Sequence, residues 1–514
     1  MFAAPFYITT AISYPNGRPH IGHAYEAVAA DAIARFQRMM GRDVCFLTGT
    51  DEHGLKMVQT ARAQGRETID LADEMSGYFR EMYEKLNISI DHFKRTTAPE
   101  HHRASQAIWE RLKASGDLYL DRYEGWYSVR DEAFYDESEL IDGEGGVKLS
   151  PQSAPVEWTT EETWFFRLSK YQQPLLDFYA ANPDFMRPES RRNETLRFVE
   201  GGLRDLSVSR TSFDWGVKVP GSEDHVMYVW LDALITYISG IGFPDDTEEW
   251  RKYWPASLHL IGKDIVRFHT VYWPAFLMSA GLPLPKQVFG HGFLLARGGE
   301  KMSKSLGNVV DPIALADQFG VDQLRYFFLR EVSFGQDGSY SPEAIVNRCN
   351  AELANSFGNL AQRVLSFIAK NCDGSVSSDS HSLADGALSV TVESHVERMK
   401  EEFDGLNLQA ALTEWINAVF ACNKYVDDQA PWALRKSDPD RMVEVLATLC
   451  DAIRQLAIAI QPVVPVGASK VLDGLGIAAE HRSFADLLTK PETWIICKPE
   501  PVFPRLELPA AELA

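Results

Sequence analysis

The sequence predicts an α/β protein in which a domain built on a parallel sheet is interrupted by an insertion and followed by a helix bundle. Short apolar strands alternate with helical stretches over the first 65 residues and again from Leu258 to Val288, a pattern typical of parallel sheets. Between about Gly116 and Gly221 the chain changes to short aromatic runs, many charges and glycine-rich loops. After Ser341 helical periodicity continues almost without a break, which predicts the bundle.

Hydrophobic periodicity and the turn residues between apolar runs set the expected elements. The sheet domain is predicted to contain, in chain order, a strand at 6–11, a helix over 22–40, a strand at 44–47, a strand at 258–261, a helix over 264–280 and a strand near 288. The bundle is predicted from helices at 343–371, 389–403, 408–428 and 439–460. Ligands are expected at the carboxyl ends of the parallel strands.

The 514 residues leave room for several domains. The predicted segments are a Rossmann-like sheet domain in two halves at 1–115 and 226–290, the insertion at 116–225, a loop region at 291–340 and the helical domain at 341–514.

Composition is that of an ordinary globular protein, with 45% hydrophobic and 24% charged residues and no apolar run long enough for a membrane span. The first ten residues lack the basic start of a signal peptide. Six cysteines without a CxxC pair argue against disulfides and a cysteine metal site and favour the cytoplasm. The net charge of −21 argues against tight non-specific nucleic-acid binding, but a structured RNA stays possible.

A histidine pair follows the first predicted strand. In Pro19-His20-Ile21-Gly22-His23, two imidazoles three residues apart stand in a first helical turn, near the positive end of the helix dipole. There they can donate hydrogen bonds to phosphate oxygens, and Gly22 leaves space for a flat base. The alternative is a chance pair of capping or core histidines. The position after a strand and a turn-rich loop favours a nucleotide site.

A cationic segment lies about 280 residues later in the chain. Lys301-Met302-Ser303-Lys304-Ser305 follows a Gly-Gly pair, and lysine suits a mobile phosphate-binding loop because it is a flexible point charge. A solvated charged turn is the usual fate of such a stretch. The joint occurrence of the two motifs in this order indicates a shared triphosphate.

These motifs resemble the paired HIGH and KMSKS signatures of class I aminoacyl-tRNA synthetases, and further segments are similar to the methionyl-tRNA synthetase family. The similarity covers about residues 5–505, with Thr50-Asp51-Glu52-His53-Gly54, Tyr228-Val229-Trp230-Leu231-Asp232-Ala233, Ile261-Gly262-Lys263-Asp264-Ile265, Phe268-His269, Asn423-Lys424-Tyr425-Val426-Asp427 and Ala430-Pro431-Trp432. The resemblance implies an ATP-dependent ligase that activates L-methionine as methionyl-adenylate with release of pyrophosphate. It then transfers methionine to the 3'-terminal adenosine of its tRNA, for initiation and elongation.

For this reaction the amino acid's carboxylate is already ionised, so alignment and charge neutralisation matter more than a general base. The candidate catalytic residues are His20, His23, Lys301 and Lys304. The ATP-binding candidates are His20, Gly22, His23, Gly262, Asp264, Lys301, Ser303 and Lys304. By resemblance Asp264 would hold the ribose hydroxyls, with capping of the following helix as the alternative. Mg²⁺ is expected to accompany ATP without a protein cage.

The resemblance also implies a methionine pocket. Asp51 would accept hydrogen bonds from the α-ammonium group, although it could instead cap a helix beginning near Glu52. Aromatic rings suit a polarizable thioether, while an aromatic stripe on a helix is more often plain core. Leu234 and Thr236 depart from a proline and a glycine expected in many family members. The methionine-binding candidates are Ile12, Tyr14, Asp51, Trp230, Ala233, Leu234, Tyr237, Ile265 and His269.

Many relatives carry a zinc knuckle made from CxxC pairs in the insertion. Here Ser128, Ser150 and Ser153 fall in the corresponding stretches, and serine is a poor Zn²⁺ ligand, so no structural zinc is expected. An insertion of roughly 105 residues is also too short for the editing domain of the isoleucine, valine and leucine enzymes. This independently favours methionine.

The helical third is expected to read the anticodon of tRNA(Met), including the initiator, because unpaired bases stack on aromatic or guanidinium planes. The candidates are Asn359, Arg363 and Trp432, with core burial as the alternative for Trp432. We expect a monomer without a membrane partner. Two rival functions are a nucleotidyltransferase that does not use RNA and a non-catalytic RNA-binding protein on the same scaffold.

Overall fold

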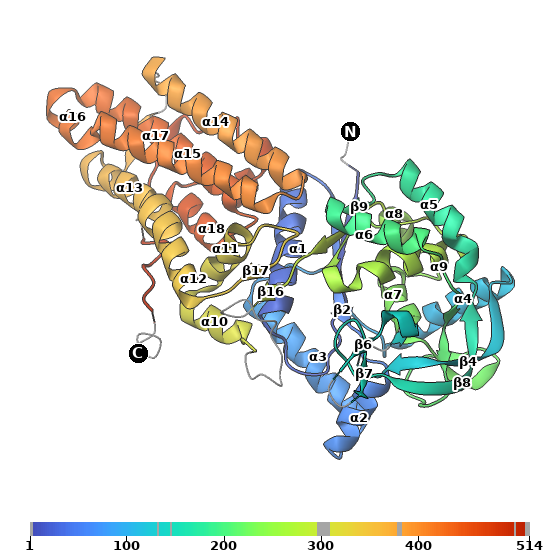
Figure 1. Ribbon diagram of the computed structural model, residues 1–514. Helices are drawn as coiled ribbons and strands as arrows, with labels where there is room; N and C mark the ends of the chain where they lie inside the picture. Colours follow the sequence, from blue (N-terminus) through green and yellow to red (C-terminus); the bar gives the residue numbers. More distant parts are fainter. Residues whose placement is uncertain are drawn as a thin grey trace.

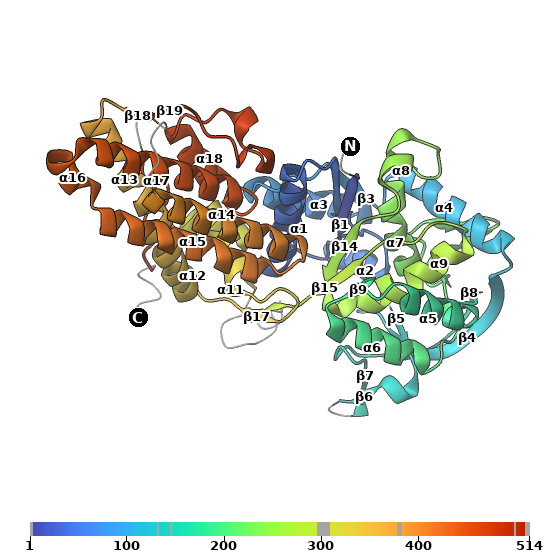
Figure 2. The same ribbon diagram turned by 90° about the horizontal axis from the view of Figure 1, so that it is seen from above.

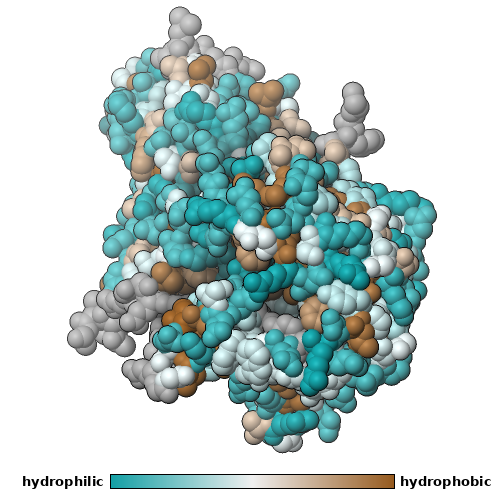
Figure 3. Space-filling model, turned by 45° about the vertical axis from the view of Figure 1, so that its right-hand side comes forward, coloured by the Kyte–Doolittle hydropathy of each residue, from teal (hydrophilic) through white to brown (hydrophobic). Residues whose placement is uncertain are grey.

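The computed structural model describes residues 4–130, 133–143, 146–295, 309–377, 383–497 and 500–508. An α/β body and a helical part lie side by side, with helix α1 (Ile21–Met39) between them (Figure 1). Seen from above, the insertion lies at the end of the α/β body farthest from the helical part (Figure 2). On the face shown in Figure 3 hydrophilic residues dominate and hydrophobic ones occur in small groups. Within the described ranges no helix combines the length and the apolar character needed to cross a bilayer.

A six-stranded sheet forms the centre of the α/β body, in the order β3-β2-β1-β14-β15-β9, and every neighbouring pair is parallel. The apolar strands at its centre are fully buried, as expected for strands covered by helices on both faces. The strands are β1 (Phe6–Thr10), β2 (Val44–Thr50), β3 (His92–Arg95), β9 (Met186–Arg187), β14 (Leu258–Gly262) and β15 (Val288–His291). The predicted parallel-sheet fold is confirmed.

The helices of the body are α1, α2 (Leu55–Ala63), α3 (Thr68–Lys85), α4 (Pro99–Ala114), α7 (Val229–Ser239), α8 (Glu248–Tyr253) and α9 (Trp273–Ser279). The single helix predicted over 264–280 is instead divided into a 3₁₀ turn, η4 (Lys263–Ile265), a π-helical turn, η5 (Phe268–Tyr272), and α9. Pro274 lies in the first turn of α9, and proline cannot donate the hydrogen bond that an uninterrupted α-helix needs.

The insertion is built mainly from antiparallel strands. They are β4 (Leu118–Ser128), β5 (Ala133–Tyr135), β6 (Ile141–Asp142), β7 (Lys148–Leu149), β8 (Glu157–Phe166), β10 (Leu206–Ser207), β11 (Ser209–Arg210), β12 (Lys218–Val219) and β13 (Ser222–Met227). Its helical segments are η1 (Glu137–Glu139), η3 (Leu168–Tyr171), α5 (Gln172–Ala181) and α6 (Glu189–Glu200). Between α5 and α6 the chain returns to the central sheet, where β9 pairs with β15. Part of the segment predicted as an insertion therefore contributes to the central sheet.

The C-terminal part is helical, in agreement with its periodicity. It contains α10 (Pro312–Phe319), α11 (Val321–Glu331), α12 (Pro342–Arg348), the π-helical η7 (Cys349–Gly358), α13 (Asn359–Asn371), α14 (Leu383–Asp404), α15 (Leu408–Gln429), α16 (Pro431–Ser437), α17 (Pro439–Ile460) and α18 (Pro465–Gly474). Short strands accompany them: β16 (Leu294–Leu295) pairs with β17 (Gly338–Ser339), and β18 (Ser375–Ser377) with β19 (Thr493–Ile495). The core of α1 is continuous with the core of these helices.

A buried ion pair joins the two parts. Arg325 of α11 and Asp31 of α1 are both fully buried, with Nη2 of the arginine 2.6 Å from Oδ2 of the aspartate. The guanidinium also donates to the carbonyl oxygens of Val463, 2.9 Å, Pro462, 2.9 Å, and Leu86, 3.2 Å. Burial opposes ionisation of Asp31, but the charges of Arg325 and Arg35 hold the pKa of this carboxyl below its usual range.

Replacing Arg325 with methionine should cost about 3–5 kcal/mol of unfolding free energy, because it removes the fully buried partner of the Asp31 carboxylate and the donor to three carbonyl oxygens. Urea denaturation of the full chain measures this loss. Arg35→Met is the matched control: Arg35 bonds to the same carboxylate, 2.7 Å, but is partly exposed, and it should cost no more than about 1 kcal/mol. Equal losses in the two variants would contradict the central role of Arg325.

Candidate active site

Four of the candidate residues, Ile12, Tyr14, Asp51 and Gly262, lie at the carboxyl edge of the central sheet. β1 leads to Ile12 and Tyr14, β2 to Asp51, and β14 to Gly262. The chain segments after β1 and β2 are tied together, because Ser13 N–H donates to the Gly49 carbonyl, 2.9 Å, and Asp51 N–H donates to the Ser13 carbonyl, 2.9 Å. The sheet thus brings together segments that are more than 200 residues apart in the sequence.

The two histidines of the first motif cap helix α1. His20 is the N-cap, and its Nδ1 accepts a hydrogen bond from the Gly22 N–H, 3.0 Å. His23 returns the contact, with its Nδ1 accepting from the His20 N–H, 3.1 Å. Since both Nδ1 atoms are acceptors, each neutral ring carries its proton on Nε2, which can donate to a phosphate oxygen. Capping was the alternative to a nucleotide role, and the two roles are compatible.

Glycine is required at position 22 for a steric reason as well as for leaving space for a base. A Cβ atom at this position would lie 2.9 Å from Cε1 of His20, so any side chain would displace the capping ring. The centroids of the two imidazoles are 3.9 Å apart. Both the helix start and the placement of the rings therefore depend on glycine here.

Lys301, Ser303 and Lys304 lie outside the described residues, but both flanks of their segment are described. β16, on the N-terminal side, lies against α1. On the C-terminal side the Val310 carbonyl accepts a hydrogen bond from the Ile21 N–H, 3.0 Å, within the histidine motif itself. The histidine motif is therefore hydrogen-bonded through its backbone to the segment that follows the lysine motif in the sequence.

Asp51 does not cap a helix. The helix after it, α2, begins at Leu55 with Gly54 as its N-cap, so the alternative role of Asp51 is excluded. The turn that carries Asp51 is held firmly: the carboxylate of Glu52 accepts from Arg95 Nε, 2.6 Å, and from Thr50 Oγ1, 2.7 Å. Asp51 is 8% exposed, at the edge where β1 and β2 end.

Asp264 follows β14 and also does not act as an N-cap. Gly262 occupies the N-cap position of the 3₁₀ turn that contains Asp264, without a side-chain cap. A Cβ atom on Gly262 would lie 2.7 Å from Oδ1 of Asp264, so the glycine lets this carboxylate fold back over the end of the strand. Asp264 is exposed and thus accessible to a polar ligand.

The aromatic candidates form one cluster between α7 and η5. Trp230 and Phe268 stack in parallel with centroids 3.7 Å apart, and Trp230 meets His269 edge-on. Tyr237, two helical turns after Trp230, forms a hydrogen bond between its hydroxyl and Nε2 of His269, 2.7 Å. Ala233 and Leu234 are buried on the same helix, and Ile265 supplies its carbonyl to His269 Nδ1, 2.9 Å.

His269 is held neutral in this cluster. Its Nδ1–H donates to the Ile265 carbonyl, so Nε2 accepts the Tyr237 hydroxyl proton. Burial lowers the pKa of His269 to about 4. The arrangement presents polarizable rings and no net charge, which suits an uncharged thioether side chain.

A second buried pair near α1 was not predicted. Glu26, one turn after His23, accepts from His291 Nε2 at the end of β15, 2.8 Å. Burial raises the pKa of Glu26; burial also opposes the charged form of His291, but the hydrogen bond and charge of Glu26 raise the pKa of this histidine. The sequence signal for Glu26 was its position three residues after His23, which puts both side chains on one face of the helix.

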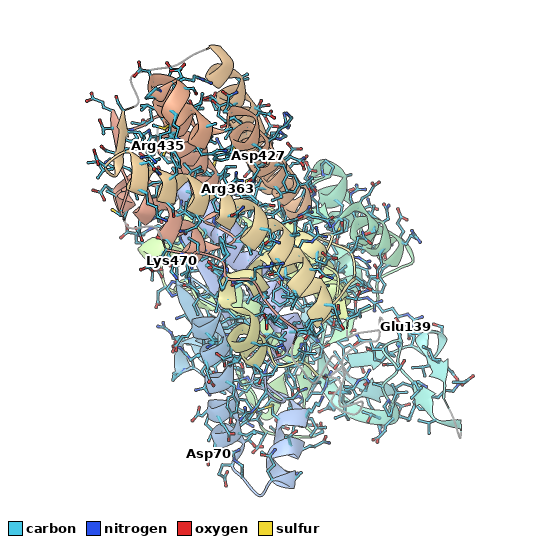
Figure 4. The ribbon with its side chains drawn as sticks, turned by 90° about the vertical axis from the view of Figure 1, so that its left-hand side faces the viewer. Asp70, Glu139, Arg363, Asp427, Arg435 and Lys470 are labelled. Carbon is cyan, nitrogen blue, oxygen red and sulfur yellow. The ribbon has the colours of Figure 1, made fainter. Side chains whose placement is uncertain are left out.

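The remaining candidates lie at the far end of the helical part. Trp432 is 47% exposed, which excludes simple core burial, and the Arg363 guanidinium lies over its ring at 5.1 Å. Arg363 Nη2 also contacts Asp427 Oδ1, 2.9 Å. Asn359, one turn before Arg363 on α13, is exposed. Figure 4 places Arg363 and Asp427 at the opposite end of the molecule from Asp70 and Glu139.

A histidine-capped helix after the first strand of a parallel sheet, with a helical domain packed against that helix, is typical of a class I tRNA synthetase. The family model described as tRNA synthetases class I (M) matches residues 6–365, and the model of the anticodon binding domain of methionyl tRNA ligase matches residues 377–496. The chain belongs to the methionine branch of the class I tRNA synthetases.

Individual relatives agree over almost the full length. Methionine--tRNA ligases of Brucella suis and Rhizobium meliloti are each 56% identical, over 97% and 99% of this chain and 98% and 99% of their own. The structure of Mycobacterium tuberculosis methionyl-tRNA synthetase in complex with methionyl-adenylate superposes with a TM-score of 0.95 at 56% identity, covering 98% of this chain and 100% of that one. The free-state structure of that enzyme gives 0.89. The predicted family, fold class and ligase activity are confirmed.

The neutral state of His269 gives a pH prediction. A folded pKa of about 4 against an ordinary value of 6.5 means that the unfolded chain binds more protons between these values. Stability from this group is complete above pH 6.5 and falls with acidification, by at most about 1.4 kcal/mol per pH unit. Urea denaturation of the wild type and of His269→Gln from pH 7.5 to 4.5 checks this, because the difference between them isolates the histidine. A difference that stays constant with pH would contradict the assignment.

Proposed function

We propose that the described site performs both steps of methionine--tRNA ligation with the residues assigned below. In the first step the methionine carboxylate oxygen bonds to the α-phosphorus of ATP, the bond to the β-phosphate oxygen breaks, and pyrophosphate leaves. In the second step the hydroxyl of the 3'-terminal adenosine attacks the carbonyl carbon, and AMP leaves. The observation that carries the assignment is the capping pair His20–His23, whose Nε2 protons are positioned by the fold.

Phosphate stabilisation is assigned to the two motifs. His20 and His23 donate to the phosphates, Lys304 neutralises the β- and γ-phosphates as charge migrates, and Lys301 and Ser303 support it. The hydrogen bond from Ile21 to Val310 supports a shared site, because it fixes one flank of the lysine segment beside the histidines. Gly262 and Asp264 take the ribose. The substrate is ATP with Mg²⁺: no cluster of potential ligands for a resident metal occurs among the described side chains, so the cation would be held by the phosphates.

Methionine recognition is assigned to Asp51 for the ammonium group and to the aromatic cluster for the side chain. Trp230, Tyr237 and His269 surround the thioether, with Ile12, Tyr14, Ala233, Leu234 and Ile265 completing the pocket. The fixed tautomer of His269 and its bond to Tyr237 support a neutral, polarizable pocket.

The tRNA partner is assigned to the helical domain at 341–514. Trp432 and Arg363 offer stacking planes and Asn359 an amide for base edges. The backbone at Ala430, with φ of 43° and ψ of 61°, is left-handed and directly precedes α16, so the turn directs Trp432 away from the core. The partner is tRNA(Met), including the initiator.

The knuckle of the insertion is proposed to need no zinc. Ser150, in one of the stretches where a thiolate would be expected, instead accepts hydrogen bonds on its Oγ from the N–H groups of Ala154, 3.2 Å, and Gln152, 3.3 Å. Arg130 donates to the carbonyls of Gln152 and Ser153. Hydrogen bonds thus stabilise the turn that a metal stabilises in a closed zinc site.

The remaining assignments concern the oligomeric state, the cellular location and the domain boundaries. We propose a monomer located in the cytoplasm, where the six cysteines, all free thiols, would stay reduced. The catalytic halves at 1–115 and 226–290, the insertion at 116–225 and the loop region at 291–340 stay as the proposed segments.

The chemistry is tested by pyrophosphate exchange with each of the twenty amino acids. Methionine alone should support strong exchange. Lys304→Ala should lower kcat by about 100-fold with little change in KM, because its contact strengthens as charge moves to the pyrophosphate. Exchange in Lys304→Ala at the wild-type rate would reject the assigned role of the lysine.

Anticodon reading is tested by Trp432→Ala. A lost stacking contact of about 1–3 kcal/mol should lower kcat/KM for tRNA(Met) about 5- to 150-fold and leave pyrophosphate exchange unchanged. Phe420→Ala is the matched control, because Phe420 is an aromatic residue of the same bundle with similar exposure, 49% against 47% for Trp432. Aminoacylation that is equally impaired in both variants would point to a general change of the bundle.

A further inference from the structure

A buried carboxylate lies beside the aromatic cluster but outside the assigned pocket. Asp232 of α7, two residues after Trp230, contacts an imidazole through each of its oxygens. Oδ2 is 2.5 Å from His53 Nδ1, and Oδ1 is 2.7 Å from His101 Nε2. The three side chains are 1%, 4% and 2% exposed, so water does not compete for these contacts.

The surroundings of Asp232 are polar and satisfied. Ser105 Oγ donates to Oδ1 at 3.3 Å, and Ser239 Oγ lies 2.9 Å from His101 Nδ1. Burial opposes ionisation, but the charges and hydrogen bonds of His53 and His101 hold the pKa of Asp232 well below its usual range. A permanently ionised carboxylate between two imidazoles is a rigid anchor, because moving either ring away would leave a buried charge unsatisfied.

The anchor joins two parts of the proposed methionine site that come from distant segments of the chain. His53 belongs to the turn between β2 and α2, and Asp51 stands two residues before it in that turn. Asp232 belongs to α7, which carries Trp230 and Tyr237. The pair His53–Asp232 therefore connects the carboxylate assigned to the ammonium group with the rings assigned to the thioether.

The other side of the turn is held independently. Glu52 is bonded to Arg95, and its carbonyl accepts from Trp215 Nε1, 2.6 Å. Neither partner belongs to α7, so these contacts fix the turn to the sheet edge and to the segment before β13. Among the described contacts of this turn, the one to Asp232 sets its position relative to α7.

We propose that Asp232 is a positioning residue for the amino acid substrate, which acts through His53 to hold Asp51 at a fixed offset from the aromatic cluster. This rests on the proposed function, in which Asp51 binds the ammonium group. Methionine has a fixed number of bonds between its nitrogen and its sulfur. Both ends can be bound together only if the turn and α7 stay in register, and small misplacements are costly.

The test compares two inhibitors of methionine-dependent exchange that differ only in the ammonium group: L-methioninol and 4-(methylthio)butan-1-ol. Asp232→Asn keeps the size of the side chain but removes its charge. It should raise the inhibition constant of methioninol roughly tenfold, the scale of a misplaced charge-assisted contact, and leave that of the desamino alcohol within about twofold. The KM for ATP should not change.

Further variants separate positioning from a general loss of structure. His53→Ala should behave like Asp232→Asn, whereas His53→Asn, which keeps an N–H donor near the Nδ1 position, should restore methioninol affinity. If Asp232→Asn does not fold, the comparison of His53→Ala with His53→Asn tests the positioning role in its place. Asp245→Asn is the matched control. Asp245 bonds to Arg103 at 2.6 Å, on helix α4, which also carries His101, but both side chains of this pair are exposed. This substitution should leave both inhibition constants unchanged.

Equal weakening of both inhibitors, or of neither, in Asp232→Asn and His53→Ala would overturn the inference. Asp51→Asn tells this failure apart from a failure of the proposed function. If Asp51→Asn weakens methioninol selectively while the Asp232 and His53 variants do not, only the positioning role is wrong. If Asp51→Asn spares methioninol, the ammonium assignment itself is wrong and the inference fails with it.

Discussion

The arrangement of the whole molecule depends on one buried ion pair, Asp31–Arg325. Asp31 lies on the helix whose first turn carries the two histidines, and Arg325 binds the connection between α17 and α18. Helix α1, whose first turn carries the two histidines, thus also sets the orientation of the helical part. Because a lone charge in this core would be very costly, the two parts can separate only by breaking a well-satisfied network.

This coupling explains how the far end of the helical part and the carboxyl edge of the sheet can keep a fixed relative position. Arg363, with Trp432 beside it, lies at the end of the molecule away from Asp70 (Figure 4), and the α/β body lies on the other side of α1 from the helical part (Figure 1). A continuous hydrophobic core runs from α1 into the helical domain. The helical part therefore meets the α/β body in an orientation that is set by packing rather than by a flexible linker.

The fold class and most of the elements could be predicted because they depend on local patterns. The apolar run before His20 and the periodicity after it predict β1 and α1 within one residue at every boundary. The division of the helix around His269 could not be predicted, because π-helical turns have no clear sequence periodicity. The return of Met186–Arg187 to the central sheet also escaped prediction, because two residues are too short for an alternation pattern.

The placement of His20, His23 and Asp51 at the carboxyl edge of the sheet was predictable, because each stands in a motif that follows an apolar strand. Partners brought in by tertiary contact were not: nothing near Glu26 in the sequence points to His291, and nothing near Asp232 points to His53. The roles of Asp51 and Asp264 as helix caps were reasonable from sequence alone. The structure excludes these capping roles, because Gly54 is the N-cap of α2, which begins at Leu55, and Gly262 is the N-cap of the turn that contains Asp264.

The capping box at the start of α1 has a consequence for acid conditions. Each imidazole uses its Nδ1 lone pair to close the helix, so a proton added to either Nδ1 removes an acceptor from the cap. The same event would release a backbone N–H at the helix start and free the ring that had accepted it. The start of α1 and the orientation of both imidazoles are therefore linked through the two Nδ1 atoms.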